Sequence, residues 1–470
     1  MLAVPASEPR LTALNRLAKA AETNPAATEA LLRFADPQHQ AGDEPLPAFD
    51  GADLSAAGLG SRVQDAAWWD AKRGGVRLTA RRLTGASLRG ANLSGADLAG
   101  TDLSKAACSG ITLRGARLEE ANLREADLIG GVLAEVDAGE ANFGEALLED
   151  VNLKAARLRF ADFTGAIMDG ADASGADLWG AKLLEVEAQR ASFRGARLDE
   201  AQLNHADLAS ADLTGASLRR ADLSGVRLRG ATLRDAVLNG ANLDGADLSG
   251  AVLPHVALTS CTLRQVRFAG AWLERTRMAA HQLGGATGEE AAGDFEAARE
   301  GYIVLEQNFR TLGSADDASW AFRRRRRMGK RLHAQRARTA LGQREVGAAL
   351  QPGLLWLADV ASEWVCDYGE SVPRVLRALL VVLVGFAAVY WLSGCLELRE
   401  AASAGAASAT RFRVVDYLLF SLDSMTTVGT SDVGFKPNGQ LGVLLSSVET
   451  VVGTVLLGLF GFVLGARMRN

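Results

Sequence analysis

The sequence contains little cysteine and histidine, and both are scattered. Its 470 residues include 4 Cys and 5 His. The cysteines show no C-x-x-C spacing and no accompanying histidine cluster, which argues against a zinc site or a disulfide framework. So few cysteines fit a reducing compartment. They are Cys108, Cys261, Cys366 and Cys395.

The chain also lacks an excess of basic charge and an apolar leader. Its formal net charge is -5, which argues against a general nucleic-acid-binding protein. The opening residues, MLAVPASEPRLTALNRLAKAAE, contain no apolar core of the kind that a secretory signal needs. Leu11, Leu14 and Leu17 instead share one face of a predicted soluble helix. We therefore expect the polar part of the chain to lie in the cytoplasm.

Signatures of catalysis are missing as well. The residues from Leu78 to Leu283 present no nucleophile, no metal-ligand cluster and no phosphate-binding loop. Coincidental G-x-G-x-x-G matches mean little in a chain with 50 Gly. We expect no enzyme activity and no cofactor.

From Leu78 to Leu283 an apolar residue, most often leucine, recurs at every fifth position. Roughly 42 consecutive positions keep this phase, usually with alanine two residues before each. Five residues rotate an α-helix by about 140° beyond a full turn, which would scatter the leucines around its surface. In a flat strand the odd spacing would send successive leucines to opposite faces. The leucines share one core only if the chain turns a corner in every repeat, which predicts a stacked coil.

The segments ANLSGADLAG, ANLREADLIG and ANLDGADLSG resemble the pentapeptide-repeat family, whose pattern is A-(D/N)-L-x-x. The resemblance covers close to half of the chain. It implies a right-handed, four-sided β-helix over residues 76–285, with four repeats in each coil. At about 4.8 Å per coil, roughly ten coils would form a rod about 50 Å long.

Some members of this family mimic DNA with an acidic surface and protect topoisomerases. The outward positions of this chain mix the two signs of charge, as in Arg114, Arg117, Glu119 and Glu120, which disfavours a mimic of duplex DNA. We expect a rigid scaffold or interaction surface. Its partner would be an unidentified cytoplasmic protein, and we expect no nucleic acid.

Both flanks of the repeats are predicted to be helical. Residues 1–75 are out of phase, and their apolar pattern with Trp68 and Trp69 predicts a helical cap for the first coil. Residues 286–372 form a predicted helical, basic linker. In it, Gly313 is expected to end one helix and Ser314 to cap the next. The apolar positions with helical spacing are Phe295, Ala298, Tyr302, Leu305 and Phe309.

Two long apolar segments lie in residues 373–470. ALLVVLVGFAAVYWLSGCL, between Arg377 and Glu397, has about the length that crosses a bilayer. NGQLGVLLSSVETVVGTVLLGLFGFVLGA, from Asn438 to Ala466, carries the single charge of Glu449 and is also long enough to span with some tilt. The alternative is a pair of buried helices in a soluble domain.

Basic residues predict the orientation of these segments. They precede the first segment and follow the second, whereas the residues between the segments contain both basic and acidic side chains. The positive-inside rule therefore places both termini in the cytoplasm. We expect the membrane to be a bacterial inner membrane. The strongest basic block would contact either anionic membrane lipids or acidic surfaces of a neighbouring subunit. It consists of Arg323, Arg324, Arg325, Arg326 and Arg327.

The residues between the two spans predict a loop that enters the membrane and returns. VVDYLLFSLDSM is apolar but too short to cross, and TTVGTSDVG follows it directly. Non-helical backbone at membrane depth is tolerated only where it is buried in protein or lines water. Backbone carbonyls and a threonine hydroxyl in such a place suit a dehydrated cation.

Span, short helix, T-V-G and span together resemble two-transmembrane potassium-type channels. The linker CDYGES, before the first span, also resembles that of bacterial proteins that join pentapeptide repeats to such a pore. The resemblance implies a pore-helix acid at Asp423 that pairs with Asp432, and an inner-helix hinge at Gly453. The implied selectivity filter comprises Thr426, Thr427, Val428, Gly429, Thr430, Ser431 and Asp432.

The filter departs from the family pattern at Thr430 and Ser431, where Tyr and Gly are usual. This leaves the permeant ion open between K⁺ and Na⁺. Glu449 is a charge inside a span, which points to a functional role; it would either face the pore or pair behind the filter with a Ser, a Thr or a neighbouring helix. One loop cannot form a ring, so the resemblance implies a homotetramer.

The sequence therefore predicts a tetrameric, potassium-permeable cation channel with cytoplasmic pentapeptide-repeat rods. The alternative is a membrane-anchored pentapeptide-repeat scaffold that does not conduct ions.

Overall fold

The computed structural model describes residues 69–70, 75–79, 82–398, 413–426 and 435–468. The chain divides into two compact units, Met1–Ala321 and Phe322–Asn470. The division falls inside α6 (Ala315–Gly342).

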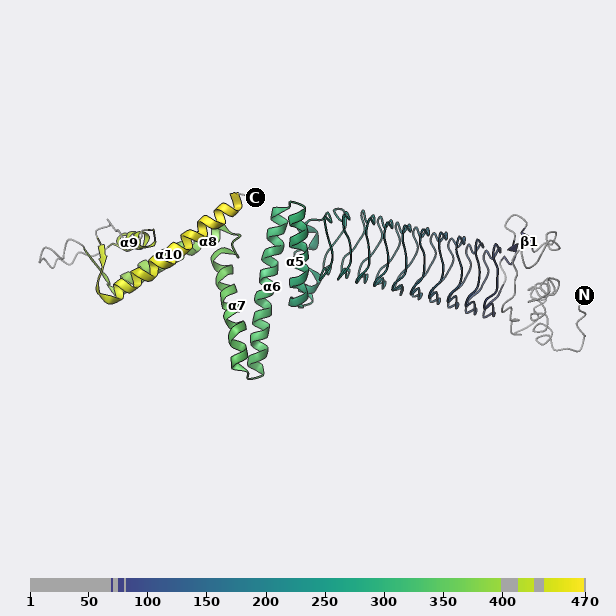
Figure 1. The fold of residues 1–470 in the computed structure, drawn as a ribbon, viewed down its shortest axis with the longest axis horizontal. Helices are drawn as coiled ribbons and strands as arrows, with labels where there is room; N and C mark the ends of the chain where they lie inside the picture. The colour runs from purple at the N-terminus through teal and green to yellow at the C-terminus, as the bar shows by residue number, and fades with distance from the viewer. Residues whose placement is uncertain (1–68, 71–74, 80–81, 399–412, 427–434, 469–470) are drawn as a thin grey trace, which may run out of the picture. The chain divides into compact units, whose positions relative to one another are not determined.

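The first unit is built around a β-solenoid in which each outward residue pairs with the residue twenty positions later. Parallel bridges run from Arg77↔Asp97 through to Ala257↔Arg277. Beside most bridges, the N–H of the following residue, usually a leucine, donates to a carbonyl of the next coil, as from Leu78 to Asp97 at 2.7 Å. Twenty residues are four pentapeptides, so the predicted coil of four repeats is confirmed. The coils form the long stack in Figure 1.

Each corner of a coil is a tight turn with a left-handed residue. The Ala86 N–H donates to the Leu83 carbonyl at 3.0 Å, and Gly85 between them has φ 68°. This is the geometry of a β-turn that needs positive φ at its third residue. Glycine adopts it freely, but Glu120 (φ 57°) and Phe160 (φ 58°) occupy the same corner position. Coil stacking therefore imposes the left-handed conformation on ordinary residues as well.

The inside of the coil holds the leucines together with the small residues that precede them. Leu128 and Ala126 are both fully buried, and the other interior positions are similar. Phe143 and Phe163, twenty positions apart, stack with ring centroids 4.8 Å apart and planes 3° apart. Equivalent residues thus lie directly above one another, and alanine keeps the narrow interior from overfilling.

The regular stack ends slightly before the five-residue spacing does. The last bridge among the described residues joins Ala257 to Arg277, and η3 (Ala280–Leu283) then begins. Leu283 is buried, but it lies in a 3₁₀ helix rather than in a coil. The prediction that coils continue to residue 285 is therefore wrong for this last stretch, because a helix closes the stack.

Helices α4 (Gly288–Ala291) and α5 (Phe295–Thr311) follow the last coil. The Glu289 carboxylate accepts hydrogen bonds from the N–H groups of Phe268 at 2.6 Å and Ala269 at 2.8 Å. The Asn308 amide pairs with both backbone groups of Thr276, at 3.1 Å and 2.8 Å. These side chains take the place of the next coil, whose backbone would otherwise pair with these groups.

The helices that follow the stack agree with the predicted pattern. The apolar positions of α5 form its buried face, Gly313 has φ 74° just beyond its end, and Ser314 immediately precedes α6. The Ser314 hydroxyl donates to the Asp317 carboxylate at 2.8 Å. The buried members of the pattern are Ala298, Tyr302, Leu305 and Phe309.

At the other end of the stack, β1 (Trp69–Asp70) pairs antiparallel with β2 (Gly75–Val76). The helix prediction is wrong at Trp69, which lies in a strand. Most of the predicted cap over residues 1–75, Trp68 included, lies outside the described residues.

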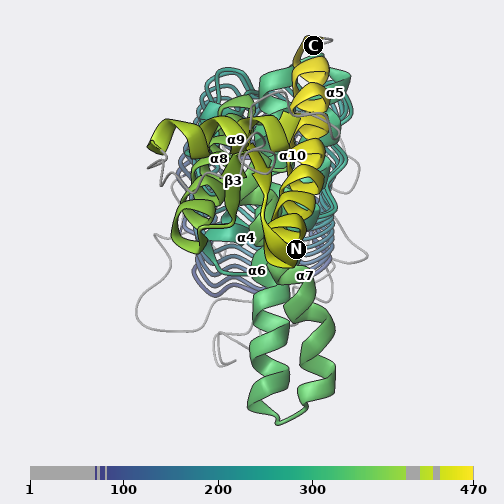
Figure 2. The same ribbon diagram turned by 90° about the vertical axis from the view of Figure 1, so that its left-hand side faces the viewer.

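The second unit is helical. Helices α6 and α7 (Val346–Cys366) form an antiparallel hairpin, seen in both views. α8 (Val372–Ser393), α9 (Val414–Thr426) and α10 (Gly439–Met468) pack together. β3 (Leu396–Leu398) pairs antiparallel with β4 (Phe435–Pro437) and so joins the end of α8 to the start of α10 (Figure 2).

Replacing Glu289 by alanine is expected to loosen the last coil. The change leaves the buried N–H of Phe268 and the partly buried N–H of Ala269 without this acceptor, and an unsatisfied buried group costs about 1–3 kcal/mol of stability. Amide hydrogen exchange of the full chain, read by mass spectrometry, should show faster exchange at Phe268 and Ala269. Glu300→Ala, at an exposed position of the neighbouring α5, is the control and should leave that exchange unchanged. Equal protection in both variants would contradict the capping role.

Candidate functional site

α8 and α10 are long and apolar enough to span a membrane, over Val372–Ser393 and Gly439–Gly465. Most of their apolar side chains are exposed: Leu380 is 59% exposed, Leu392 76% and Val455 63%. Core helices of a soluble domain bury such side chains. Within the single chain these helices are therefore largely uncovered, and their place in a membrane stays a prediction.

α9 is the short helix predicted between the two apolar segments. It begins at Val414 and ends at Thr426, and it contacts both α8 and α10. Its inner face is buried at Tyr417, Phe420 and Met425. The ring of Phe420 meets that of Tyr390 on α8 edge to face, with centroids 5.1 Å apart. The predicted helix is confirmed; its entry into a membrane stays a prediction.

A buried polar cluster ties α8, α9 and α10 together. Glu449 of α10, Ser421 of α9 and Tyr390 of α8 are all fully buried. The Tyr390 hydroxyl donates to one Glu449 carboxylate oxygen at 2.9 Å, and the Ser421 hydroxyl donates to the other. Ser421 also lies 2.9 Å from the Leu383 carbonyl oxygen. Glu449 therefore pairs with a serine and a tyrosine of two neighbouring helices, and its place behind a filter stays a prediction.

Gly453 marks the closest approach of α10 to the end of α9. A Cβ atom at this position would lie 2.7 Å from the Met425 carbonyl oxygen and 2.8 Å from the Met425 Cα. Real Cβ atoms do not come so close to backbone. The residue therefore serves close packing in this structure, and its role as a hinge stays a prediction.

The filter itself is largely outside the described residues. Thr426 ends α9, and its hydroxyl donates to the Leu422 carbonyl at 2.7 Å. Asp423 lies half-buried on α9. The remaining filter positions, Thr427, Val428, Gly429, Thr430, Ser431 and Asp432, lie outside the described residues, as does the expected pairing of Asp423 with Asp432.

The arginine block of α6 contacts acidic residues of α7 in the same chain. Arg326 pairs with Asp359 at 3.2 Å, and Arg327 pairs with Glu363 at 3.0 Å. Arg325 lies over the Phe322 ring, 5.1 Å from its centroid, and Arg324 is half-buried on the same helix. These ion pairs lie within one chain, so they involve neither of the predicted partners, a lipid or a neighbouring subunit.

Asp367 connects this hairpin to the first apolar helix. It follows α7 in the left-handed conformation, with φ 51°, and is almost fully buried. Its carboxylate forms ion pairs with Arg327 at 3.4 Å, with Arg323 at 3.8 Å and with Arg374, in the first turn of α8, at 3.2 Å. One carboxylate therefore joins α6, the end of α7 and the start of α8.

Sequence reasoning missed these acidic partners, although a signal for them is present. Asp359, Glu363 and Asp367 follow one another at four-residue spacing, which places them on one face of a helix. On α6, Lys330 also bonds to Glu363, and the His333 ring lies 3.0 Å from Asp359. Two helices with complementary charges at matching spacing predict an antiparallel pair.

These contacts shift the ionisation of Glu363. Burial acts to raise the pKa of this carboxyl, but the hydrogen bonds and charges of Lys330 and Arg327 outweigh burial and hold the pKa below its usual range. The charged form is thus favoured in the folded hairpin. Among the described residues, no group of three or more His, Cys, Asp or Glu could hold a metal ion.

The solenoid matches a known family of proteins. The sequence model for pentapeptide repeats matches overlapping segments that run from residue 75 to residue 278. The chain belongs to the pentapeptide-repeat family. The matched segments stop before α4, so this assignment concerns the solenoid and leaves the second unit open.

Solved structures of other pentapeptide-repeat proteins are similar to part of the chain. HetL from Nostoc sp. strain PCC 7120 is 34% identical, with 42% of this chain and 83% of HetL covered and a TM-score of 0.19. QnrB1, a plasmid-mediated fluoroquinolone resistance protein, is 17% identical, with 44% and 93% covered and a TM-score of 0.28. No curated protein matches this sequence.

Replacing Gly453 by alanine is expected to destabilise the packing of α9 on α10. The new methyl group would displace the Met425 backbone, and overpacking of this kind typically costs about 1–3 kcal/mol. The melting temperature of the detergent-solubilised protein should fall. Gly458→Ala, on the same helix with no atom within 4 Å of the new Cβ, is the control and should leave the melting temperature unchanged or raise it. Equal effects of both changes would refute the close-packing role.

The Glu363 contacts should stabilise the hairpin only above acidic pH. Because the folded pKa is lowered, the contribution is complete above the ordinary value of about 4.3. It is lost as pH falls through the lowered folded pKa. Melting temperatures of the natural chain and Glu363→Gln should differ near neutral pH and converge below about pH 4. A difference that stays constant across this range would show that ionisation is not the cause.

Proposed function

We propose that this chain is the subunit of a homotetrameric, potassium-permeable cation channel of the bacterial inner membrane, with both termini in the cytoplasm. The observation that carries the proposal is the placement of α9, which is held between two apolar helices and ends directly before T-V-G. The pentapeptide-repeat rods would serve as a scaffold or regulatory domain.

The length of α9 suits a helix that enters a bilayer without crossing it. Its 13 residues extend about 20 Å, whereas the hydrocarbon core is about 30 Å thick. The carboxyl end of a helix carries partial negative charge. The α9 end at Thr426 would therefore favour a cation beside the filter. There, backbone carbonyls of Thr427 and Val428 would replace the water around the ion.

The Glu449 cluster would brace the filter from behind. Ser421 lies five residues before Thr426 on α9, and its hydroxyl is bonded to an acid on α10 that has no exposed surface. Inside a membrane such a group is costly unless it is hydrogen-bonded. The three helices therefore gain a fixed register, and the position of the α9 end follows from it. Four copies around one axis would form the conduction path.

A second candidate is a membrane-anchored scaffold that does not conduct. The outer surface of the solenoid favours it, because oppositely charged side chains on adjacent coils pair with each other. Arg114 reaches Glu135 at 2.8 Å, and Lys154 reaches Asp172 at 2.9 Å. These pairs suit a rod whose task is to hold partners apart or together. Both candidates share the same fold and differ only in ion flux.

Cation flux into proteoliposomes separates the two candidates. The purified full chain should conduct potassium, and Gly429→Val should abolish the flux because a branched side chain distorts the filter backbone. Gly458→Ala, which should be tolerated in α10, is the control for handling and reconstitution. Size-exclusion chromatography should show the same oligomer for all three proteins. Absent flux in the natural chain would leave the scaffold as the function.

Reversal potentials under potassium on one side and sodium on the other then define the ion. We expect potassium to permeate better, because Thr427, Val428 and Gly429 supply the inner part of a potassium-type filter. Equal permeability would assign the departure at Thr430 and Ser431 to a non-selective cation filter and remove potassium preference from the proposal.

A further inference from the structure

The end of the α6–α7 hairpin that lies away from α8 exposes an unusual amount of apolar surface. We refer to residues 331–358 as the distal hairpin. Leu350 is 62% exposed and Leu354 66%, and Leu357 is also exposed. From Val346 to Ala358 the helix carries no charge. A helix that is apolar on nearly all sides normally has a covering partner or a lipid environment.

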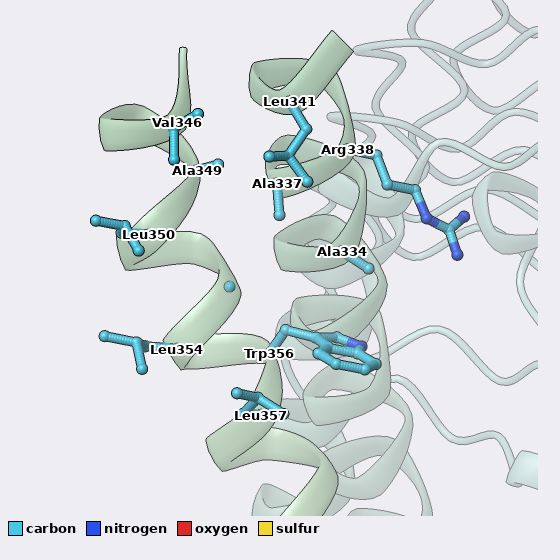
Figure 3. A pocket seen from close by; sticks show the side chains of 11 residues that line it. Ala334, Ala337, Arg338, Leu341, Val346, Ala349, Leu350, Leu354, Trp356 and Leu357 are labelled. Atoms are coloured by element: carbon cyan, nitrogen blue, oxygen red, sulfur yellow. The ribbon is translucent and has the colours of Figure 1, made fainter. Parts of the chain in front are cut away.

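The distal hairpin also contains a groove of about 470 Å³ between its two helices. Leu341 and Ala337 of α6 line it, together with Trp356 of α7. Figure 3 shows Trp356 turned toward α6, whereas Leu350 and Leu354, which also line the groove, point away from α6. The two helices thus leave one broad apolar face of α7 uncovered.

The charge of the distal hairpin is strongly one-sided. Residues 331–358 contain four arginines, and Glu345 is their single acid. The acids that neutralise the Arg323–Arg327 block, Asp359 and Glu363 among them, all lie outside this stretch. Arg338 and Arg344 are exposed, and Arg338 also lines the groove. Apolar surface bordered by arginine is the chemistry of a helix that lies on an anionic bilayer.

The connection to α8 places the other end of this hairpin close to the predicted membrane. Only residues 367–371 separate α7 from α8. Arg377 of α8 donates to the Trp364 carbonyl of α7 at 2.8 Å, and its guanidinium lies 5.4 Å from the centroid of the Trp364 ring. If α8 and α10 cross a bilayer, the carboxyl end of α7 therefore lies at its surface.

We propose that the distal hairpin binds the anionic cytoplasmic surface of the bilayer, with Leu350 and Leu354 inserted among the lipids and Arg338 and Arg344 at the headgroups. The inference rests on the membrane assignment in the proposed function and is independent of ion conduction. A second copy of the chain is a less favourable partner for this surface, because its arginines would repel the arginines of the first copy. The proposed lipid-binding residues therefore differ from the predicted ones. The Arg323–Arg327 block is largely paired with acids, and the proposed contact lies at the far end of the same hairpin.

Spin labels in the full chain, reconstituted in vesicles, test the location of this surface. The four native cysteines are replaced by alanine, and labels are placed at Leu354→Cys, at Leu380→Cys on α8 and at Arg157→Cys on the solenoid. Accessibility to oxygen, which concentrates in lipid, is compared with accessibility to a water-soluble nickel complex. In vesicles of phosphatidylcholine with phosphatidylglycerol, we expect a several-fold preference for oxygen at 354 and 380 and the reverse at 157.

Lipid charge and protein charge should both change the oxygen preference of the label at 354 and leave that of the label at 380 unchanged. The oxygen preference at 354 should fall in vesicles without phosphatidylglycerol, at high salt, and in a chain that also carries Arg338→Glu and Arg344→Glu. Arg220→Glu, an exposed change on the solenoid, is the matched control and should have no effect.

Three results would overturn the proposal. A label at 354 that is accessible mainly to nickel while 380 remains in lipid would place the hairpin in water. Dipolar broadening between labels at 354 would identify a second copy of the chain as the occupant. A label at 380 in water would remove the membrane assignment and the proposed function together. Lipid exposure at 354 in vesicles without cation flux would support the hairpin inference and reject only the channel.

Discussion

Pairing of backbone groups across a step of twenty residues is the interaction on which the first unit depends. Each coil supplies the donors and acceptors that its neighbours need, so a single coil would leave nearly all of them open. The same requirement explains the end of the stack. Glu289 and Asn308 carry side-chain oxygens and an amide to positions where a further coil would have placed its backbone. The helices that follow are therefore part of the closure of the solenoid.

The second unit satisfies its polar groups in a different way. Helices pair their own backbone, so the groups that need partners are side chains, and these gather at two places. Asp367 forms ion pairs with arginines from α6 and α8, and Glu449 accepts hydrogen bonds from hydroxyls of α8 and α9. An unpartnered carboxylate at either place would be strongly destabilising. Each cluster thus fixes how three segments meet, while apolar side chains on α8 and α10 remain on the outside.

The two units also show where a pattern in the sequence is sufficient and where it is not. The five-residue period requires a corner in every repeat. The number of repeats in each coil, which is four, follows from the resemblance to pentapeptide repeats. The left-handed corners at Glu120 and Phe160 escape prediction, because neither residue prefers positive φ. The arginine block is likewise misleading in isolation: its charge suggests an external partner, but Asp359 and Glu363 follow more than thirty residues later.

By itself, the sequence determined the solenoid, the helical character of the segments that follow and the existence of a short helix between two apolar ones. Periodicity and length decide these features, because they depend on neighbours along the chain. Tertiary structure alone decided which acid meets which arginine, that Glu449 is bonded within its own chain, and that Gly453 is needed for contact with Met425. Such contacts depend on the meeting of distant segments at distances of a few ångströms, which no local pattern specifies.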